Sequence, residues 1–153
     1  MADNTIIQKL IHTWSLFKRP MTLGVRVLVE NELGEILLVK HTYVSGWYFP
    51  GGGIETRETA EDAVRKELME ETSIEVEGDV QLVGVYLNNR ASKRDHVLLY
   101  KCVEWSEIQK FEPNREISEI GFFPVDALPD DVTPATRRRI LEIYEGEKVS
   151  PYW

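Results

Sequence analysis

Hydrophobic and polar residues follow two different periods along this chain, and each period predicts a different kind of element. Alternation with a period of two is typical of strands, and it predicts one at residues 23–29. Short runs bounded by turn residues predict further strands at residues 35–40, 47–50, 80–88, 96–104 and 121–125. Apolar residues every three to four positions are typical of helices, and they predict helices at residues 1–20, 59–72 and 133–146. Strands in the middle of a chain with helices around them favour a mixed α/β fold with helices packed on a sheet.

The predicted helix at residues 59–72 has a core-facing side that changes from apolar to acidic halfway along. Its apolar part consists of Ala60, Ala63, Val64 and Leu68. Glu67 and Glu71 continue this side of the helix, and Glu70 lies beside it. Crowded carboxylates repel one another unless a counter-charge is present, and Mg²⁺ or Mn²⁺, which prefer oxygen ligands, would supply it. We therefore predict a divalent-metal site at these three glutamates.

The alternative is a solvated acidic surface held by ion pairs with lysine or arginine four residues away. The available pairs are Glu61 with Arg65 and Asp62 with Lys66, and both lie on the other side of the helix. They leave the three glutamates without a partner, so the metal site is the better interpretation.

Three consecutive glycines, Gly51 to Gly53, precede this helix and follow the predicted strand at residues 47–50. Glycine adopts backbone angles that a side chain forbids, so such a turn can direct a carbonyl at a metal or let phosphates approach the backbone. A plain loop is the alternative for any glycine run. Thr59, with Asp62 three residues on, is the predicted N-cap at which the helix begins.

Together these residues resemble the Nudix box of the Nudix hydrolases. The matching positions are Gly52, Glu58, Glu67, Leu68, Glu70, Glu71 and Ile74. Two positions depart from the family pattern, because Lys66 replaces an arginine and Ser73 replaces a glycine. The family arginine orients the loop and a glutamate through a planar fork that lysine lacks. Position 73 is the predicted helix end, where glycine relieves a left-handed conformation.

The resemblance implies a Nudix-like α/β/α sandwich with a mixed central sheet. It covers approximately residues 22–144, within one predicted domain at residues 21–146. It also implies Mg²⁺ or Mn²⁺ as the cofactor, with the metal held by Gly51 through its carbonyl and by Glu67, Glu70 and Glu71.

The activity that the resemblance implies is hydrolysis of a phosphoanhydride in a nucleoside diphosphate linked to another group, with release of a nucleoside monophosphate. The catalytic base would be Glu70, or Glu116 or Glu119 from a later loop, with Glu116 slightly favoured, and Glu58 would orient the glutamates. Nucleoside triphosphates, nucleotide sugars, ADP-ribose, dinucleoside polyphosphates and capped RNA all contain the diphosphate. The box therefore does not distinguish among them.

Two other classes of function are compatible with a related fold. A catalytically weak or inactive nucleotide-binding module is suggested by Lys66 and Ser73, but no carboxylate of the box is lost. An isoprenyl diphosphate isomerase would use a cysteine and further histidines. Cys102 in a predicted strand and three scattered histidines disfavour that chemistry.

Six further residues are candidates for substrate binding: Arg26, His41, Tyr43, Trp47, Arg90 and Arg94. Arginines suit phosphate oxygens, although a solvated hairpin tip is the favoured interpretation of the stretch that holds Arg90 and Arg94. The aromatic residues and His41 could stack on a base or close the pocket. Packing in the core or at its rim is the alternative for them.

Composition and charge limit the kinds of binding partner and the cellular compartment expected for this protein. A net charge of -8 and a pI near 5.0 leave no basic face for long nucleic acid, so a small nucleotide is the expected partner. Cys102, the single cysteine, lies in an apolar run and is expected to be a core thiol in a reducing cytoplasm. No signal peptide or membrane segment is evident.

Both ends of the chain carry apolar residues outside the predicted domain. The amphipathic helix at residues 1–20 is expected to pack on its own domain. Docking against a partner subunit in a homodimer and lying on a membrane surface are the alternatives. The tail at residues 147–153 ends in apolar surface that could serve a dimer or fold back on the monomer.

Overall fold

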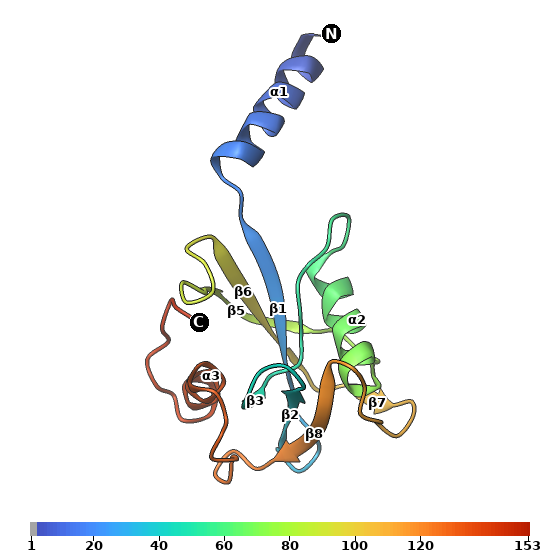
Figure 1. Cartoon of the computed structure of the whole chain (residues 1–153). Helices are drawn as coiled ribbons and strands as arrows, with labels where there is room; N and C mark the ends of the chain where they lie inside the picture. The colour runs from blue at the N-terminus through green and yellow to red at the C-terminus, as the bar shows by residue number, and fades with distance from the viewer. Residues whose placement is uncertain (1–2) are drawn as a thin grey trace.

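The computed structural model describes residues 3–153, and it has the predicted mixed α/β architecture (Figure 1). Its helices are α1 (Asp3–Lys18), α2 (Ala60–Thr72) and α3 (Pro134–Tyr144). Its strands are β1 (Thr22–Val29), β2 (Ile36–His41), β3 (Trp47–Tyr48), β4 (Ile74–Val76), β5 (Gln81–Leu87), β6 (Asp95–Cys102), β7 (Trp105–Glu107) and β8 (Ile117–Phe123). The first two residues of the predicted N-terminal helix lie outside the described residues.

The strands form two three-stranded sheets and a small ribbon. In the first sheet the order is β1-β6-β5, with β1 parallel to β6 and β5 antiparallel to it. In the second the order is β3-β2-β8, and both pairs are antiparallel. β4 and β7 pair with each other in the ribbon. The parallel pair among antiparallel ones confirms the predicted mixed sheet.

Two hydrophobic cores lie on opposite faces of the first sheet because successive strand residues point to opposite sides. Val25 and Val27 of β1 pack with Val64 and Leu68 of α2 in the first core. Leu28 belongs to the second core, which α3 covers. The principal members of that core are Leu28, Leu38, Phe49, Leu99 and Ile140. Cys102 is fully buried in the first core, as predicted.

Three parts of the sheets were not predicted from the sequence. β4 and β7 have three residues each, which is too short for a period to be recognised. β8 begins at Ile117 rather than at residue 121, and its added residues Ser118 and Glu119 are polar and exposed. Glu119 pairs with Lys40 and Ile117 pairs with His41, and the register shift between these two pairs leaves Ser118 without a partner residue in β2.

α1 does not pack against the domain, so that expectation is wrong. Leu10 and Trp14 of this helix are 65% and 63% exposed, and Figure 1 shows the helix projecting away from the start of β1. The alternative, docking against a partner subunit, is consistent with this exposure. No helix within residues 3–153 is both long and apolar enough to cross a membrane.

The C-terminal tail folds back on the monomer, which was one of the two alternatives. The Leu87 N–H donates to the Pro151 carbonyl at 2.9 Å, and the Trp153 N–H donates to the Leu87 carbonyl at 3.0 Å. The tail thereby extends the first sheet beyond β5, with Leu87 and Tyr152 forming a parallel bridge.

Deletion of residues 1–19 should change the free energy of unfolding of the domain by less than about 0.5 kcal/mol, because the apolar side chains of α1 are exposed rather than buried on the domain. Urea denaturation checks this. Leu68→Ala is the matched control, since it empties a fully buried site and should cost about 2–5 kcal/mol. A deletion as costly as the control would show that α1 contributes to the fold.

Ser73, one of the two departures from the Nudix box, ends α2 in the left-handed conformation, with φ 61° and ψ 25°. Its N–H donates to the Met69 carbonyl at 3.1 Å. A side chain is strained in this conformation, whereas glycine is not. The structure therefore explains why glycine suits this position.

Ser73→Gly should raise the free energy of unfolding by about 0.5–1 kcal/mol, measured by urea denaturation. Gly34→Ala is the control with the opposite sign. Gly34 has a φ of 74°, and an added Cβ there would meet no atom within 4 Å, so only backbone strain would change. Destabilisation by Ser73→Gly would contradict this account of the cap.

Candidate functional site

The glycines that precede α2 lie beside β1 as an irregular extra strand. The Val25 N–H donates to the Gly52 carbonyl and the Val27 N–H to the Pro50 carbonyl, both at 2.9 Å. Gly51 has a φ of 138°, and a Cβ there would collide with the Val25 carbonyl. A Cβ at Gly52 would lie 2.6 Å from the Glu67 carboxylate. Glycine is needed at position 51, where the β1 backbone leaves no room for a Cβ, whereas the atoms met at Gly52 belong to the flexible end of Glu67.

Glu71 ties α2 to this glycine segment. It is only 5% exposed, and its Oε2 accepts a hydrogen bond of 2.8 Å from the Gly51 N–H. Burial raises the pKa of Glu71 to about 7, although the Gly51 hydrogen bond and the positive charge of Arg26 act in the opposite direction. A carboxyl group with a raised pKa is costly to ionise, and a cation beside it would reduce that cost.

Lys66 takes over part of the role of the family arginine. Its Nζ lies 3.0 Å from Glu58 Oε1, 3.5 Å from Glu55 Oε1 and 3.8 Å from Glu67 Oε1. Glu58 also accepts a hydrogen bond of 2.8 Å from the Glu55 N–H. Lys66 therefore links Glu58 to Glu67 as a point charge rather than through a fork. The orienting role of Glu58 stays a prediction.

Glu67 is the second carboxylate beside the glycines. Burial raises the pKa of Glu67, the positive charge of Lys66 opposes this shift, and the charge of Glu70 adds to it. Glu70 itself is exposed. The helix thus presents Glu71 buried, Glu67 partly buried and Glu70 at the surface.

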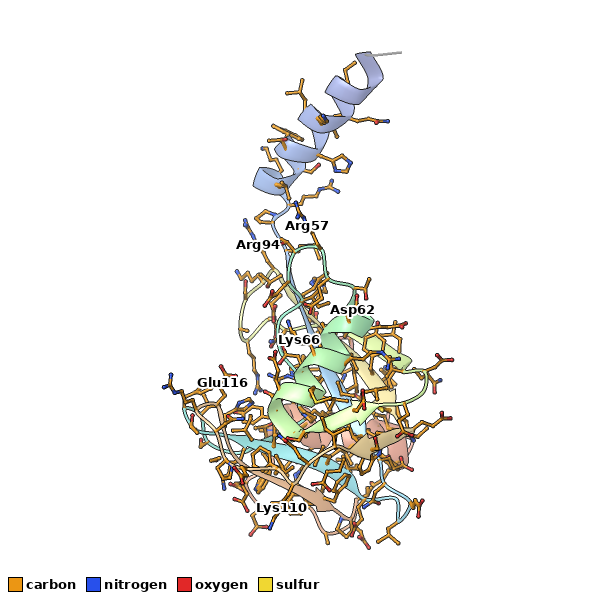
Figure 2. All side chains as sticks on the ribbon, turned by 90° about the vertical axis from the view of Figure 1, so that its right-hand side faces the viewer. Arg57, Asp62, Lys66, Arg94, Lys110 and Glu116 are labelled. Carbon is orange, nitrogen blue, oxygen red and sulfur yellow. The ribbon has the colours of Figure 1, made fainter. Side chains whose placement is uncertain are left out.

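Glu116 and Glu119 are the two candidates from the later loop, and Glu116 is the one whose charge affects the carboxylates of α2. Its negative charge contributes to the raised pKa of both Glu67 and Glu71. Figure 2 shows it at the level of the C-terminal half of α2. Glu119 instead lies within β8, paired with Lys40 of β2. The structure therefore favours Glu116 over Glu119 as a member of the site.

The predicted three-glutamate cluster is not assembled as these side chains lie. Within residues 3–153 no three His, Cys, Asp or Glu side chains converge closely enough to hold a metal ion. The donor chemistry nevertheless fits a hard cation, because Glu67 and Glu71 are carboxylates whose ionisation burial disfavours. Glu67, Glu71 and Glu70 would hold such an ion. The metal-binding role of the Gly51 carbonyl stays a prediction.

Arg26 lies between the carboxylates and the cavities described below. Its Nη1 donates to the Phe49 carbonyl at 2.9 Å, and its charge acts to lower the pKa of Glu67 and of Glu71. Burial, together with the charge of Arg26, lowers the pKa of His41. The His41 ring lies 5.2 Å from that of Tyr43 and 5.4 Å from that of Tyr48. His41 and Tyr43 therefore accompany Arg26 and Glu116 at this site.

The structure places the other three predicted substrate-binding residues in different surroundings. Trp47 is buried in the second core, with its ring 4.9 Å from that of Phe123, so the core-packing alternative applies to it. Arg90 lines a cavity. Figure 2 shows Arg94 at the end of the domain next to α1, away from Glu116. The structure thus does not bring Arg94 to the carboxylates, and the hairpin-tip alternative describes it better.

Two cavities lie beside Arg26. The larger, of about 670 Å³, lies between the β5–β6 turn and the start of α3. The smaller, of about 270 Å³, borders Gly52 and Gly53. Arg26, Asn88 and Trp153 line both. Asn88 and Trp153 were not predicted, because only the fold-back of the tail onto β5 brings them together.

Comparison with known proteins assigns the family. Residues 20–143 match the family model described as the NUDIX domain. A putative 8-oxo-dGTP diphosphatase from Bacillus subtilis is 30% identical over 125 residues, which are 82% of this chain and 81% of that protein. An RNA pyrophosphohydrolase from Pseudomonas aeruginosa is 41% identical over 61 residues, and this match spans only 40% of this chain and 38% of that enzyme.

A solved structure agrees with the sequence match. The MutT NUDIX hydrolase from Burkholderia pseudomallei superposes with a TM-score of 0.68 at 26% identity, over 80% of this chain and 97% of that one. The chain therefore belongs to the Nudix hydrolase family, a family of pyrophosphohydrolases, and it has the predicted Nudix fold.

The raised pKa of Glu71 predicts that stability falls as pH rises when no divalent cation is present. The folded state favours the neutral carboxyl group, so the stabilisation is complete below the ordinary pKa of 4.5 and is lost as pH rises towards about 7. The expected loss from Glu71 is about 1–3 kcal/mol. Urea denaturation in EDTA at pH 4.5 and pH 8 measures it.

Glu71→Gln keeps an oxygen for the Gly51 N–H and cannot ionise, so it should flatten this pH dependence. Glu61→Gln, at an exposed position on the same helix, should leave the dependence as it is in the unmodified chain. Equal pH dependence in all three proteins would contradict the assignment to Glu71.

Proposed function

We propose that this chain is a divalent-cation-dependent pyrophosphohydrolase that cleaves a phosphoanhydride in a nucleoside diphosphate linked to another group and releases a nucleoside monophosphate. The observation that carries the proposal is the pair of partly desolvated carboxylates, Glu67 and Glu71, beside a glycine segment. A diphosphate can approach Gly52 and Gly53 because these two residues are at least partly exposed and carry no side chain of their own. The putative 8-oxo-dGTP diphosphatase among its relatives supports a small nucleotide as substrate.

The charges at the site support this chemistry. Mg²⁺, when bound, would supply neutralisation of the diphosphate and activation of water. Glu67, Glu70 and Glu71 would hold the ion, and Lys66 would keep Glu58 and Glu67 in place. Arg26 would add a positive charge on the side that faces the cavities.

We propose Glu116 as the group that accepts the proton from the attacking water, with Glu70 as the second candidate. Glu116 is exposed and close enough for its charge to act on Glu67, Glu71 and His41. Attack of water at phosphorus would need no covalent enzyme intermediate. We further propose a reducing compartment such as the cytoplasm, since the single cysteine is buried and unpaired.

The binding-module alternative loses part of its support. It was suggested by Lys66, which nevertheless contacts both Glu58 and Glu67. Ser73 strains the helix end without removing a carboxylate. A module of this kind would bind nucleotides with Mg²⁺ and release no product.

An activity panel with Mg²⁺ tests the function. The substrates are dGTP, 8-oxo-dGTP, ADP-ribose and UDP-glucose, and chromatography detects the nucleoside monophosphate. Glu71→Gln should lower turnover by a factor of about 10² or more, because the amide keeps the shape and loses the charge. Glu61→Gln should keep full activity. Unchanged Mg²⁺-dependent turnover in Glu71→Gln would overturn the metal assignment.

Three further variants assign the base. Glu116→Gln should lower kcat by about 10²–10⁴ and should leave the binding of a non-hydrolysable nucleotide unchanged. Glu70→Gln and Glu119→Gln are measured in parallel. A comparable loss confined to one of those two variants would assign the proton transfer to that residue instead.

A further inference from the structure

The C-terminal segment that ends at Trp153 is held in place by a buried ion pair on α3. Arg139 is fully buried, and its Nη2 donates to Glu142 Oε1 at 2.6 Å. The same Glu142 oxygen accepts a hydrogen bond of 2.9 Å from the Ser150 N–H, and Arg139 Nη1 donates to the Ser150 carbonyl at 3.3 Å. The pair therefore satisfies both backbone groups of Ser150 and anchors the segment.

The last residue of the segment has its own contacts. The Trp153 ring lies 5.7 Å from the Tyr86 ring, and the Arg139 guanidinium lies 5.9 Å from the Trp153 ring centre. The Trp153 N–H donates to Leu87, as described above, and its carbonyl accepts a hydrogen bond of 3.3 Å from Arg138. Both the N–H and the carbonyl of Trp153 are thus hydrogen-bonded, so the indole is held in one place.

This fixed indole forms part of the wall of both cavities, of which the smaller borders the glycine segment. Tyr48, Arg90 and the start of α3 also line the larger cavity, and Gly52 lines the smaller one. Arg26 lines both cavities, and its positive charge acts to lower the pKa of Glu67 and of Glu71. A molecule whose diphosphate lies on the glycines would therefore place its remaining half towards Trp153.

We propose that Trp153 is a specificity-determining residue that stacks on the planar ring of the substrate, so that the cavity selects a diphosphate joined to a nucleobase. This inference rests on the proposed function, since it takes the diphosphate to lie at the glycines. A volume of about 670 Å³ suits one nucleoside. Indole offers a rigid aromatic face at low entropic cost, and stacking on it tolerates any base.

Equilibrium binding tests this without turnover, so a failure of the proposed hydrolysis does not decide it. The probes are a dGTP analogue with a non-hydrolysable α,β bridge and inorganic tripolyphosphate, each measured by calorimetry with Mg²⁺. Trp153→Ala should weaken binding of the analogue about 5- to 100-fold and leave tripolyphosphate binding unchanged. Trp153→Phe should restore most of the affinity, because it keeps an aromatic face.

Tyr152→Ala is the matched control. Tyr152 precedes Trp153, is 47% exposed and bridges Leu87 through its backbone, so its side chain should not affect either probe. If Trp153→Ala unfolds, Trp153→Leu, which keeps apolar bulk without a π face, takes its place. Equal weakening of both probes, or no weakening of the analogue, would overturn the proposal.

If the chain also turns over nucleotides, the two kinetic constants separate stacking from catalysis. Stacking acts equally on substrate and transition state, so Trp153→Ala should raise KM and leave kcat nearly unchanged. A loss in kcat without a change in KM would show that Trp153 acts on the reacting groups instead.

Discussion

The hydrogen bond from the Gly51 N–H to the buried carboxylate of Glu71 is the interaction on which the site depends. It joins α2 to the glycine segment, and that segment is itself hydrogen-bonded along β1. The sheet, the turn and the helix are therefore fixed relative to one another at the point where a diphosphate would lie. Burial of the Glu71 carboxyl group is unfavourable for stability, and its proposed role as a cation ligand accounts for its position here.

Two cations, Lys66 and Arg26, act on the carboxylates around this bond. Lys66 contacts Glu55, Glu58 and Glu67, while Arg26 acts on Glu67 and Glu71 from the opposite side. The departure from arginine at position 66 thus preserves the electrostatic link between Glu58 and Glu67. What it loses is the bidentate geometry of a guanidinium group.

The second half of the site depends on a different buried pair. Arg139 and Glu142 sit on α3, far from the Nudix box in sequence, and they secure the backbone of the tail. Two separate polar anchors therefore hold the glycine segment and Trp153 in place, namely the Gly51–Glu71 hydrogen bond and the Arg139–Glu142 pair. Each anchor is buried and hydrogen-bonded, which is the condition under which a polar group can fix geometry within a core.

Elements and candidate ligands that follow local rules could be predicted from the order of residues alone. α2, its capping box at Thr59 and its left-handed end at Ser73 were predictable, because caps and helical periods involve residues within a few positions of one another. The identities of Glu67, Glu70 and Glu71 were predictable for the same reason. The burial of Trp47 in the core, the exposure of α1 and the position of Trp153 at the cavities became evident in the folded chain alone. Those outcomes depend on contacts between distant segments, which no local period encodes.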